Sequence, residues 1–301
     1  MTVLINVVLP IFAVAGLAAL AQARLRLDPA TLSRSAFYLF GPALVFDSLT
    51  TSDVGGLVLL QMAAVVLALT AILWILGALV ARWLHLEGAT RAAFLNAILL
   101  VNAGNYGLPV NLFAFGPAGL ARAALYLTVN SMLSSSVGVY LGASSGASVW
   151  TALKRVARVP LVYAAAVGLA VNLAGWTVPE PLAKAIALLG QASVPVMLSM
   201  LGITLAETFQ QGVQSRCLPA LGAVTALRLV LSPLLAFLLA GWLGLDGLAR
   251  DVTVLESAMP SAVMTIILAA EFEADRAFAA LCVLGTTLGS LVTVTLLLNL
   301  L

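Results

Sequence analysis

The sequence predicts an all-α polytopic membrane protein with ten transmembrane helices, arranged as two inverted five-helix repeats. Of its 301 residues, 62% are hydrophobic and only 9% are charged, whereas a soluble domain carries about 25% charged residues. Charge-free apolar runs near the length that a membrane helix needs, about 20 residues, recur along the chain. These runs are too long and too unbroken for barrel strands. Prolines also recur at a matching spacing in the two halves of the chain.

Charges and helix breakers set the expected ends of the helices. The motif Ala21–Ala23 resembles a signal-peptidase site, but no positive residue precedes it and its apolar run is longer than a signal h-region. We therefore expect a retained first helix. The ten expected helices are 3–21, 32–50, 55–82, 92–116, 119–142, 159–177, 182–207, 218–243, 251–271 and 277–300.

The proline spacing predicts an internal repeat. Three proline pairs lie 150, 153 and 151 residues apart, namely Pro10 with Pro160, Pro42 with Pro195, and Pro109 with Pro260. A proline inside a helix destabilises that helix by about 3 kcal/mol. Three matched prolines are therefore unexpected unless they have a structural or functional role. We expect residues 1–146 to form the first five-helix repeat and residues 147–301 the second.

Charge predicts the orientation of the repeats. Because five is an odd number, the second repeat must enter the membrane from the opposite side. The connections between helices 1 and 2, 3 and 4, 5 and 6, 7 and 8, and 9 and 10 hold ten basic residues, and the opposite side holds three. By the positive-inside rule the basic side is cytoplasmic, so both termini lie outside the cell membrane. The ten are Arg24, Arg26, Arg34, Arg82, Arg91, Lys154, Arg155, Arg158, Arg216 and Arg276.

The stretch Leu99–Phe113 places asparagines, glycines, a tyrosine and a proline inside an apolar segment. Pro109 removes an amide donor, while Gly104 and Gly107 let the backbone leave helical geometry. The matched stretch in the second half is Leu255–Thr265. We expect two broken helices to cross near these breaks, as in secondary transporters with inverted repeats. Their half-helix N-termini would attract a carboxylate.

Asn102, Asn105 and Asn111 supply hydrogen-bond donors and acceptors without a permanent charge, which suits a substrate that must also be released. Tyr106 can hydrogen-bond or flank an apolar substrate body. Asn130 and Ser134 lie one turn apart on the fifth expected helix. The alternative is that such groups only satisfy freed backbone atoms or bond a neighbouring helix.

Asp47 and Glu256 lie in segments between charges that are too short to span the hydrocarbon alone, so both acids are expected within or near membrane depth. Asp47 and Glu256 are candidates for coupling to H⁺ or Na⁺; Asp47 also fits an interfacial position at a helix end. Arg228 lies inside the expected helix 218–243. It needs a partner, for which the candidates are a substrate carboxylate, Glu207 and Glu256, unless it snorkels. A structural pairing is favoured.

Several function classes are disfavoured. The net charge of +2 is spread thinly over loops, so nucleic acid is not indicated. The single histidine, His85, excludes a histidine-built metal cluster, and we expect no metal site and no cofactor. Paired acids for Mg²⁺ chemistry and zinc-protease motifs are absent from the sequence, so we do not expect an enzyme. A membrane sensor that transports nothing remains an alternative.

The two crossover segments resemble the auxin efflux carrier family, in its bacterial, PIN-like branch. Asn102, Gly107 and Pro109 fit its asparagine followed five residues later by Gly-x-Pro, and Met259–Leu291 resembles its Met-Pro-Ser segment with the acidic patch and hydroxyl run beyond. The resemblance implies broken crossover helices 4 and 9, a scaffold that often dimerises, and transport of organic anions. It implies a substrate site at Asn102 and Pro109, with Pro260 and its neighbour Ser261 opposite.

This resemblance leaves the substrate open. Plant members move indole-3-acetate, and bacterial members are linked with malate-like or malonate-like acids. Asn105 and Tyr106 stand where many members have apolar residues, and Thr286 replaces the usual serine. The sodium–proton antiporters and sodium–bile acid symporters share the crossover. A sodium-coupled symporter of a larger amphipathic acid, with Glu256 and Asn105 as sodium ligands, is therefore the alternative transport function.

Overall fold

The computed structural model describes residues 3–142, 154, 156–210 and 217–301. This part of the chain is helical, and its extended pairing is limited to one isolated antiparallel bridge. Six of its helices are long and apolar enough to cross a membrane, which fits the predicted polytopic membrane protein. They are Ile5–Leu25, Gly56–Trp83, Ala103–Ser135, Glu180–Gln210, Leu218–Trp242 and Arg276–Leu300. The expected boundary between repeats, at residues 146 and 147, lies outside the described residues.

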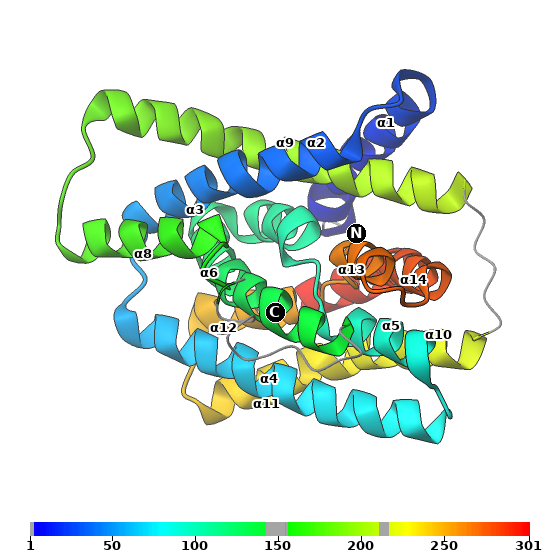
Figure 1. The fold of residues 1–301 in the computed structure, drawn as a ribbon. Coiled ribbons are helices and arrows are strands. Elements are labelled where there is room, and N and C mark those ends of the chain that lie inside the picture. The colour runs from blue at the N-terminus through cyan, green and yellow to red at the C-terminus, as the bar shows by residue number, and fades with distance from the viewer. Residues whose placement is uncertain (1–2, 143–153, 155, 211–216) are drawn as a thin grey trace.

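One group of helices, which we call the scaffold, packs along α9 (Figure 1). Gly202 of α9 lies directly against the backbone of α1, since a Cβ there would come within 1.9 Å of the Ala15 carbonyl oxygen. α9 also contacts α2, η2 and α3, and α3 packs against α8. The scaffold comprises η1 (Leu4–Val8), α1 (Leu9–Leu25), α2 (Pro29–Ser35), η2 (Ala36–Phe40), α3 (Gly41–Thr50), α8 (Pro160–Leu173) and α9 (Glu180–Gln210), where η marks a π-helical turn.

The remaining helices form a second group, which we call the crossover bundle. In Figure 1, α4 and α11 run side by side, and the contacts of α11 with both α4 and α12 agree. The bundle comprises α4 (Gly56–Trp83), α5 (Gly88–Leu99), η3 (Ala103–Gly107), α6 (Leu108–Gly142), α10 (Leu218–Ala226), η4 (Leu227–Leu231), α11 (Ser232–Trp242), α12 (Gly247–Ser257), α13 (Met264–Glu271) and α14 (Arg276–Leu300). Its α6 also contacts α3 and α8, so this helix runs along the interface with the scaffold.

α6 is divided by a sharp kink at Gly116. This residue has φ 66° and ψ −160°, and Pro117 follows it. The positive φ requires a residue without a Cβ, and the proline cannot continue the preceding hydrogen-bond ladder. The kink falls between the expected helices 92–116 and 119–142.

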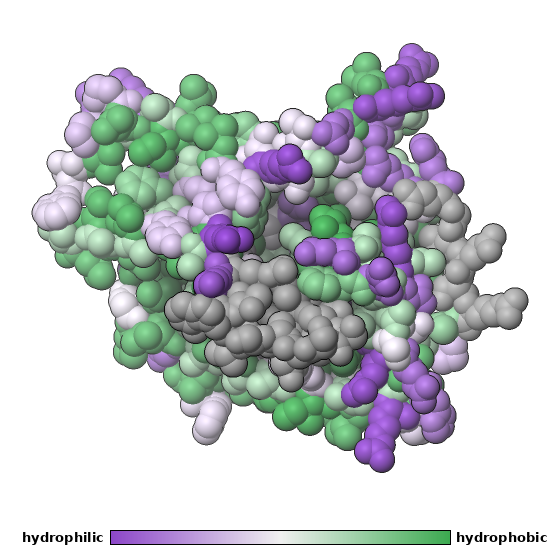
Figure 2. Space-filling model, in the orientation of Figure 1, coloured by the Kyte–Doolittle hydropathy of each residue, from purple (hydrophilic) through white to green (hydrophobic). Residues whose placement is uncertain are grey.

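The surface fits a protein embedded in lipid. Large apolar side chains are exposed along the helices, among them Leu20, Leu60 and Leu188, each about 70% exposed. Figure 2 shows hydrophilic side chains gathered at the end of the molecule that carries the α1–α2 and α4–α5 connections. Those connections belong to the side on which the sequence concentrates basic residues.

Candidate substrate site at the helix crossing

Two broken helices meet at a short backbone bridge. α5 ends at Leu99 and α12 at Ser257, and the extended segments that follow run antiparallel at Val101 and Ser261. The N–H of Asn102 donates to the Pro260 carbonyl at 2.9 Å, and the N–H of Ala262 donates to the Leu100 carbonyl at 2.7 Å. Each break thus satisfies backbone groups that the other leaves without helical partners.

Neighbouring helices hold this bridge in place. The Ser261 N–H donates to Thr286 Oγ1 on α14 at 3.1 Å, and the Ser261 hydroxyl donates to the Ala97 carbonyl at 2.6 Å. From α6, the Asn130 side-chain amide donates to the Val101 carbonyl at 3.3 Å. Both extended segments are therefore anchored by side chains as well as by each other.

Arg228 caps the C-termini of α5 and α12, which are the first halves of the two broken helices. Its guanidinium, on η4 and 2% exposed, donates to the Ile98 carbonyl of α5 at 2.7 Å, the Ser257 carbonyl of α12 at 2.5 Å and the Ser232 hydroxyl at 2.9 Å. Helix C-termini carry unpaired carbonyls and partial negative charge, so a guanidinium fits them. The favoured structural pairing is found, but its partners are these oxygens rather than the expected carboxylates of Glu207 or Glu256.

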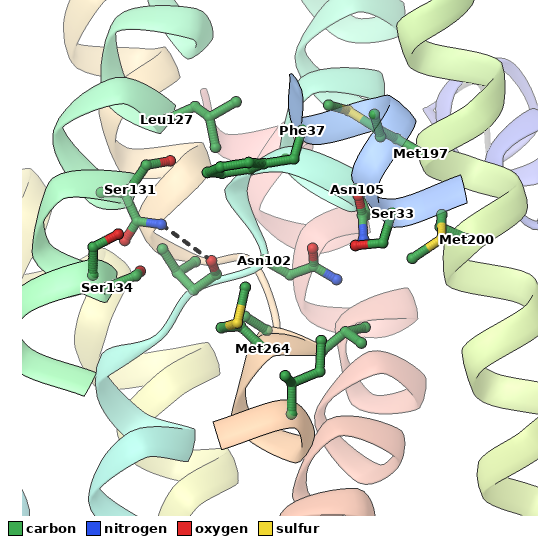
Figure 3. Close-up of a pocket in the computed structure, with 18 of the residues that line it drawn as sticks. Ser33, Phe37, Asn102, Asn105, Leu127, Ser131, Ser134, Met197, Met200 and Met264 are labelled. Atoms are coloured by element: carbon green, nitrogen blue, oxygen red, sulfur yellow. Dashed lines mark hydrogen bonds between the residues drawn. The ribbon is translucent and has the colours of Figure 1, made fainter. Parts of the chain in front are cut away.

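A cavity of ≈ 320 Å³ lies beside the crossing, between the scaffold and the bundle. Figure 3 shows the Asn102 side chain pointing into it, with Ser33, Phe37, Met197 and Met200 on the scaffold side. Its polar lining comes from Ser33, Asn102, Asn105, Asn130, Ser131, Ser134 and Ser135, and Glu271 is its one charged lining residue. The remaining walls are apolar, and include Phe37, Leu127, Leu161, Met197, Met200, Met264 and Ile267.

Asn102 lines the cavity with a side-chain amide that has no hydrogen-bond partner among the described residues, whereas the other buried atoms near the crossing that lack one, such as Arg228 Nε, Glu256 Oε2 and Thr265 Oγ1, belong to residues outside the cavity lining. The side chain is buried, at 4% exposure for the residue, and Nδ2 has no hydrogen-bond partner in the described part of the chain. A buried donor without a partner costs about 1–3 kcal/mol. The amide is therefore placed to bond something that enters the cavity.

The structure divides the expected site residues between the cavity and the protein interior. Asn102, Asn105 and Asn130 line the cavity. Tyr106, next to Asn105 in η3, is fully buried and faces the other way: its hydroxyl accepts from Ser290 Oγ at 3.2 Å, and its ring packs edge-on against Phe12, with centroids 6.0 Å apart.

Among the expected breaker residues, Gly104 lines the cavity, whereas Gly107, Pro109, Pro260 and Ser261 do not. Pro260 and Ser261 form the bridge itself. Pro109 is the second residue of α6, which continues directly from the π-helical turn η3. Gly107 lies against the Glu256 carboxyl group, since a Cβ there would come within 2.2 and 2.6 Å of the two carboxyl oxygens.

Glu256 is fully buried on α12, away from the cavity. The Asn111 amide donates to Glu256 Oε1 at 2.9 Å and to the Gly107 carbonyl at 3.0 Å. Glu256 Oε2 has no partner among the described residues. Asn111, expected only as part of a polar cluster, is the residue that reaches the buried acid.

Asp47 lines a second cavity of ≈ 470 Å³, together with Leu44, Ser48, Ser52, Asp53, Leu112, Pro117, Gln191 and Val194 among others. The two cavities share no lining residue. Ser131 completes the first cavity with Leu127, Asn130 and Ser134. The spacing of three and four residues that places these four on one helix face was a signal available in the sequence.

Comparison with known proteins identifies the family of the chain. A family described as "Membrane transport protein" matches residues 148–298. An uncharacterized transporter of Methanothermobacter thermautotrophicus is 33% identical over 272 residues, which cover 89% of this chain and 88% of that protein. An uncharacterized transporter of Methanocaldococcus jannaschii is 30% identical over 207 residues, which cover 66% of this chain and 64% of that protein. The chain therefore belongs to the membrane transport protein family, which is the family of the auxin efflux carriers that its crossover segments resemble. It is a membrane transporter.

Proposed function

We propose that this transporter is a secondary carrier of a small organic carboxylate, which it binds in the cavity beside the crossing and moves by alternating access. The observation that carries the proposal is the buried Asn102 amide, which has no hydrogen-bond partner among the described residues and lines the cavity. A transported ligand is the partner that such a donor lacks.

The lining favours an anion that is held without a fixed positive charge. Amide and hydroxyl groups of Asn102, Asn105 and Ser131 can donate to a carboxylate, and α13 begins at Met264 on the cavity wall. The N-terminus of a helix adds partial positive charge. Among the described residues no guanidinium or ammonium group lines the cavity, and Glu271 adds an acidic group, so we expect moderate binding that allows release.

The apolar walls favour a substrate with one carboxylate and an apolar body. Phe37, Leu127 and Met197 lie opposite or beside the polar groups, as Figure 3 shows. The second carboxylate of a dicarboxylate would face methionine and aromatic surface, where an unpaired charge is costly. We therefore favour an aromatic or aliphatic monocarboxylate over a malate-like acid.

Alternating access is supported by the two cavities at the interface between scaffold and bundle. One face of α9 serves both, since Gly190 and Val194 line the second cavity and Met197 and Met200 line the first. We propose that two inverted five-helix units build this arrangement, with the bundle moving against the scaffold in the cell membrane. A scaffold-mediated homodimer and termini outside the cell are part of the same proposal.

The test is uptake by purified protein in liposomes. Labelled indole-3-acetate and malate are offered with a proton gradient, a sodium gradient or none. Asn102→Ala should lower the catalytic efficiency of uptake about 10- to 100-fold, the range of a hydrogen bond to a charged group. Asn299→Ala, which removes an exposed amide at the far end of α14, is the control and should transport normally. Unchanged uptake by folded Asn102→Ala protein would exclude this cavity as the site.

Glu256 is the favoured coupling group for H⁺ or Na⁺, because it touches the η3 turn that carries Asn105 into the cavity. Asp47, in the second cavity, is the other candidate. Glu256→Gln keeps the shape of the side chain and removes the titrating oxygen, so uptake should lose its dependence on the driving ion. A variant that keeps the full pH and sodium dependence would return Glu256 to a structural role.

A further inference from the structure

An ion pair crosses the edge of the second cavity. Arg122 Nη2 lies 3.1 Å from Asp53 Oδ1, and Arg122 Nη1 donates to the Ala118 carbonyl at 3.0 Å. Asp53 lines the cavity, as do Ala118 and Ala121 beside Arg122. The Arg122 side chain is 12% exposed and the Asp53 side chain 80% exposed.

Arg122, on α6, belongs to the crossover bundle, whereas Asp53 lies on the connection from scaffold helix α3 to bundle helix α4. Asn172 of α8 binds this connection to the scaffold, with its amide donating to the carbonyls of Thr50 at 3.0 Å and Ser52 at 2.8 Å. The Arg122–Asp53 pair therefore connects the bundle to the part of this connection that α8 holds, and we expect movement of one body past the other to stretch or break the pair.

Two other ion pairs at this end of the molecule do not have this property. Lys184 pairs with Glu180 one turn away on α9, at 2.6 Å, and Arg250 pairs with its neighbour Asp251 on α12, at 3.1 Å. Each lies within a single helix and would move as a unit. These two pairs therefore serve as a comparison for the Arg122–Asp53 pair.

We propose that the Arg122–Asp53 ion pair is a latch that holds the second cavity closed in this state, and that an organic anion entering the cavity opens the latch by replacing Asp53 on Arg122. Arg122 is then the group that binds the substrate on this face, and the substrate carboxylate replaces the Asp53 carboxylate on its guanidinium. The identity of the anion rests on the proposed function, whereas the latch can be tested without transport.

The experiment measures the reaction of single introduced cysteines with a polar maleimide in purified, detergent-solubilised protein that carries Cys217→Ser and Cys282→Ala. The reporter for the second cavity is Ser48→Cys, and the reporter for the first is Ser134→Cys. Arg122→Gln and Asp53→Asn should each speed labelling at position 48 about two- to fivefold, the range that an ion pair of this exposure supports. Labelling at position 134 should slow in the same variants.

Three comparisons decide between a latch and a local effect. Lys184→Gln, the matched control on α9, should leave both rates unchanged. The charge exchange Arg122→Asp with Asp53→Arg should return labelling at position 48 to the parent rate. Indole-3-acetate should speed labelling at position 48 in the parent protein and have no effect in Arg122→Gln.

Unchanged rates in both single variants, or a charge exchange that labels as fast as they do, would overturn the latch. Arg122→Lys keeps the charge and should keep the slow rate, which separates loss of the pair from misfolding. A latch that responds to both single variants but not to indole-3-acetate, in a protein without measurable uptake, would retain the mechanical role and overturn anion exchange and the proposed substrate class.

Discussion

The two breaks at the helix crossing are built differently. The first, residues 100–107, contains a π-helical turn and presents Asn102, Gly104 and Asn105 to the first cavity. The second, residues 258–263, is compact: its Ser261 uses both its N–H and its hydroxyl in hydrogen bonds and is fully buried. The first break keeps a donor in reserve, whereas the second uses its polar groups for structure. Two breaks at matched positions in the halves of the chain can thus serve different purposes, one for binding and one for support.

The largest expected effect comes from a residue that serves both breaks. Arg228→Met removes hydrogen bonds to the Ile98 and Ser257 carbonyls and to the Ser232 hydroxyl, and among the described residues only the Ser257 carbonyl keeps another side-chain donor, Ser232 Oγ. Each hydrogen bond that involves a charged group contributes about 1.5–3 kcal/mol. The variant should show a large fall in the midpoint of thermal unfolding in detergent.

Arg228→Lys is the comparison for this prediction. It keeps one charge but not the fork that reaches two helix ends, so an intermediate midpoint is expected. A parent-like midpoint for Arg228→Met would mean that the two half-helices do not depend on this cap.

A smaller loss of stability is expected where the first break touches α12. Gly107→Ala would place a Cβ against the Glu256 carboxyl group. Overpacking of this kind costs about 1–3 kcal/mol. Because the crowding involves one partner, Gly107→Ala combined with Glu256→Ala should be less destabilised than the sum of the two single variants in the same unfolding measurement. Simple additivity would contradict the contact.

The smallest effects should separate two neighbours in the first break. Asn105→Ala removes a cavity amide and should weaken substrate affinity in an uptake or binding titration by about tenfold or less, with little change in stability. Tyr106→Phe removes the bond to Ser290 and should lower stability by about 1 kcal/mol, without a change in substrate affinity. A reversed pattern would mean that the binding face of η3 has been assigned to the wrong side.

Helix positions and the presence of two polar breaks were predictable, because apolar length, proline and glycine act locally. The place of the crossing was not. Pro109 lies near the start of α6, whereas Pro260 lies in the contact between the two breaks. Proline fits both positions because it has no N–H to donate, so the residue type does not tell the two positions apart. The bridge at Val101 and Ser261 depends on the approach of two segments that are distant in the sequence, and neither residue type predicts such a contact.

Side-chain direction within the site was equally hard to predict. Asn105 and Tyr106 are adjacent, yet only Asn105 faces the cavity. For Arg228, the sequence suggested carboxylate partners, because acidic residues can be read directly from a sequence. The backbone carbonyls that it binds become available only at the C-termini of α5 and α12, whose positions in space the sequence does not give. Asn102 lines the cavity, as its position beside a break suggested, and its role in substrate binding stays a prediction.

The bridge between the two breaks has a consequence for biosynthesis. About 160 residues separate Asn102 from Pro260, and each supplies a bond that the other needs. At about 5–20 residues per second, the ribosome reaches Pro260 roughly 8–30 s after Asn102. During that interval the N–H of Asn102 and the Leu100 carbonyl lack their final partners inside an apolar segment. The nascent first half must therefore wait beside the translocon or its helpers, and truncated chains that end before Ala262 should be targets for membrane quality control.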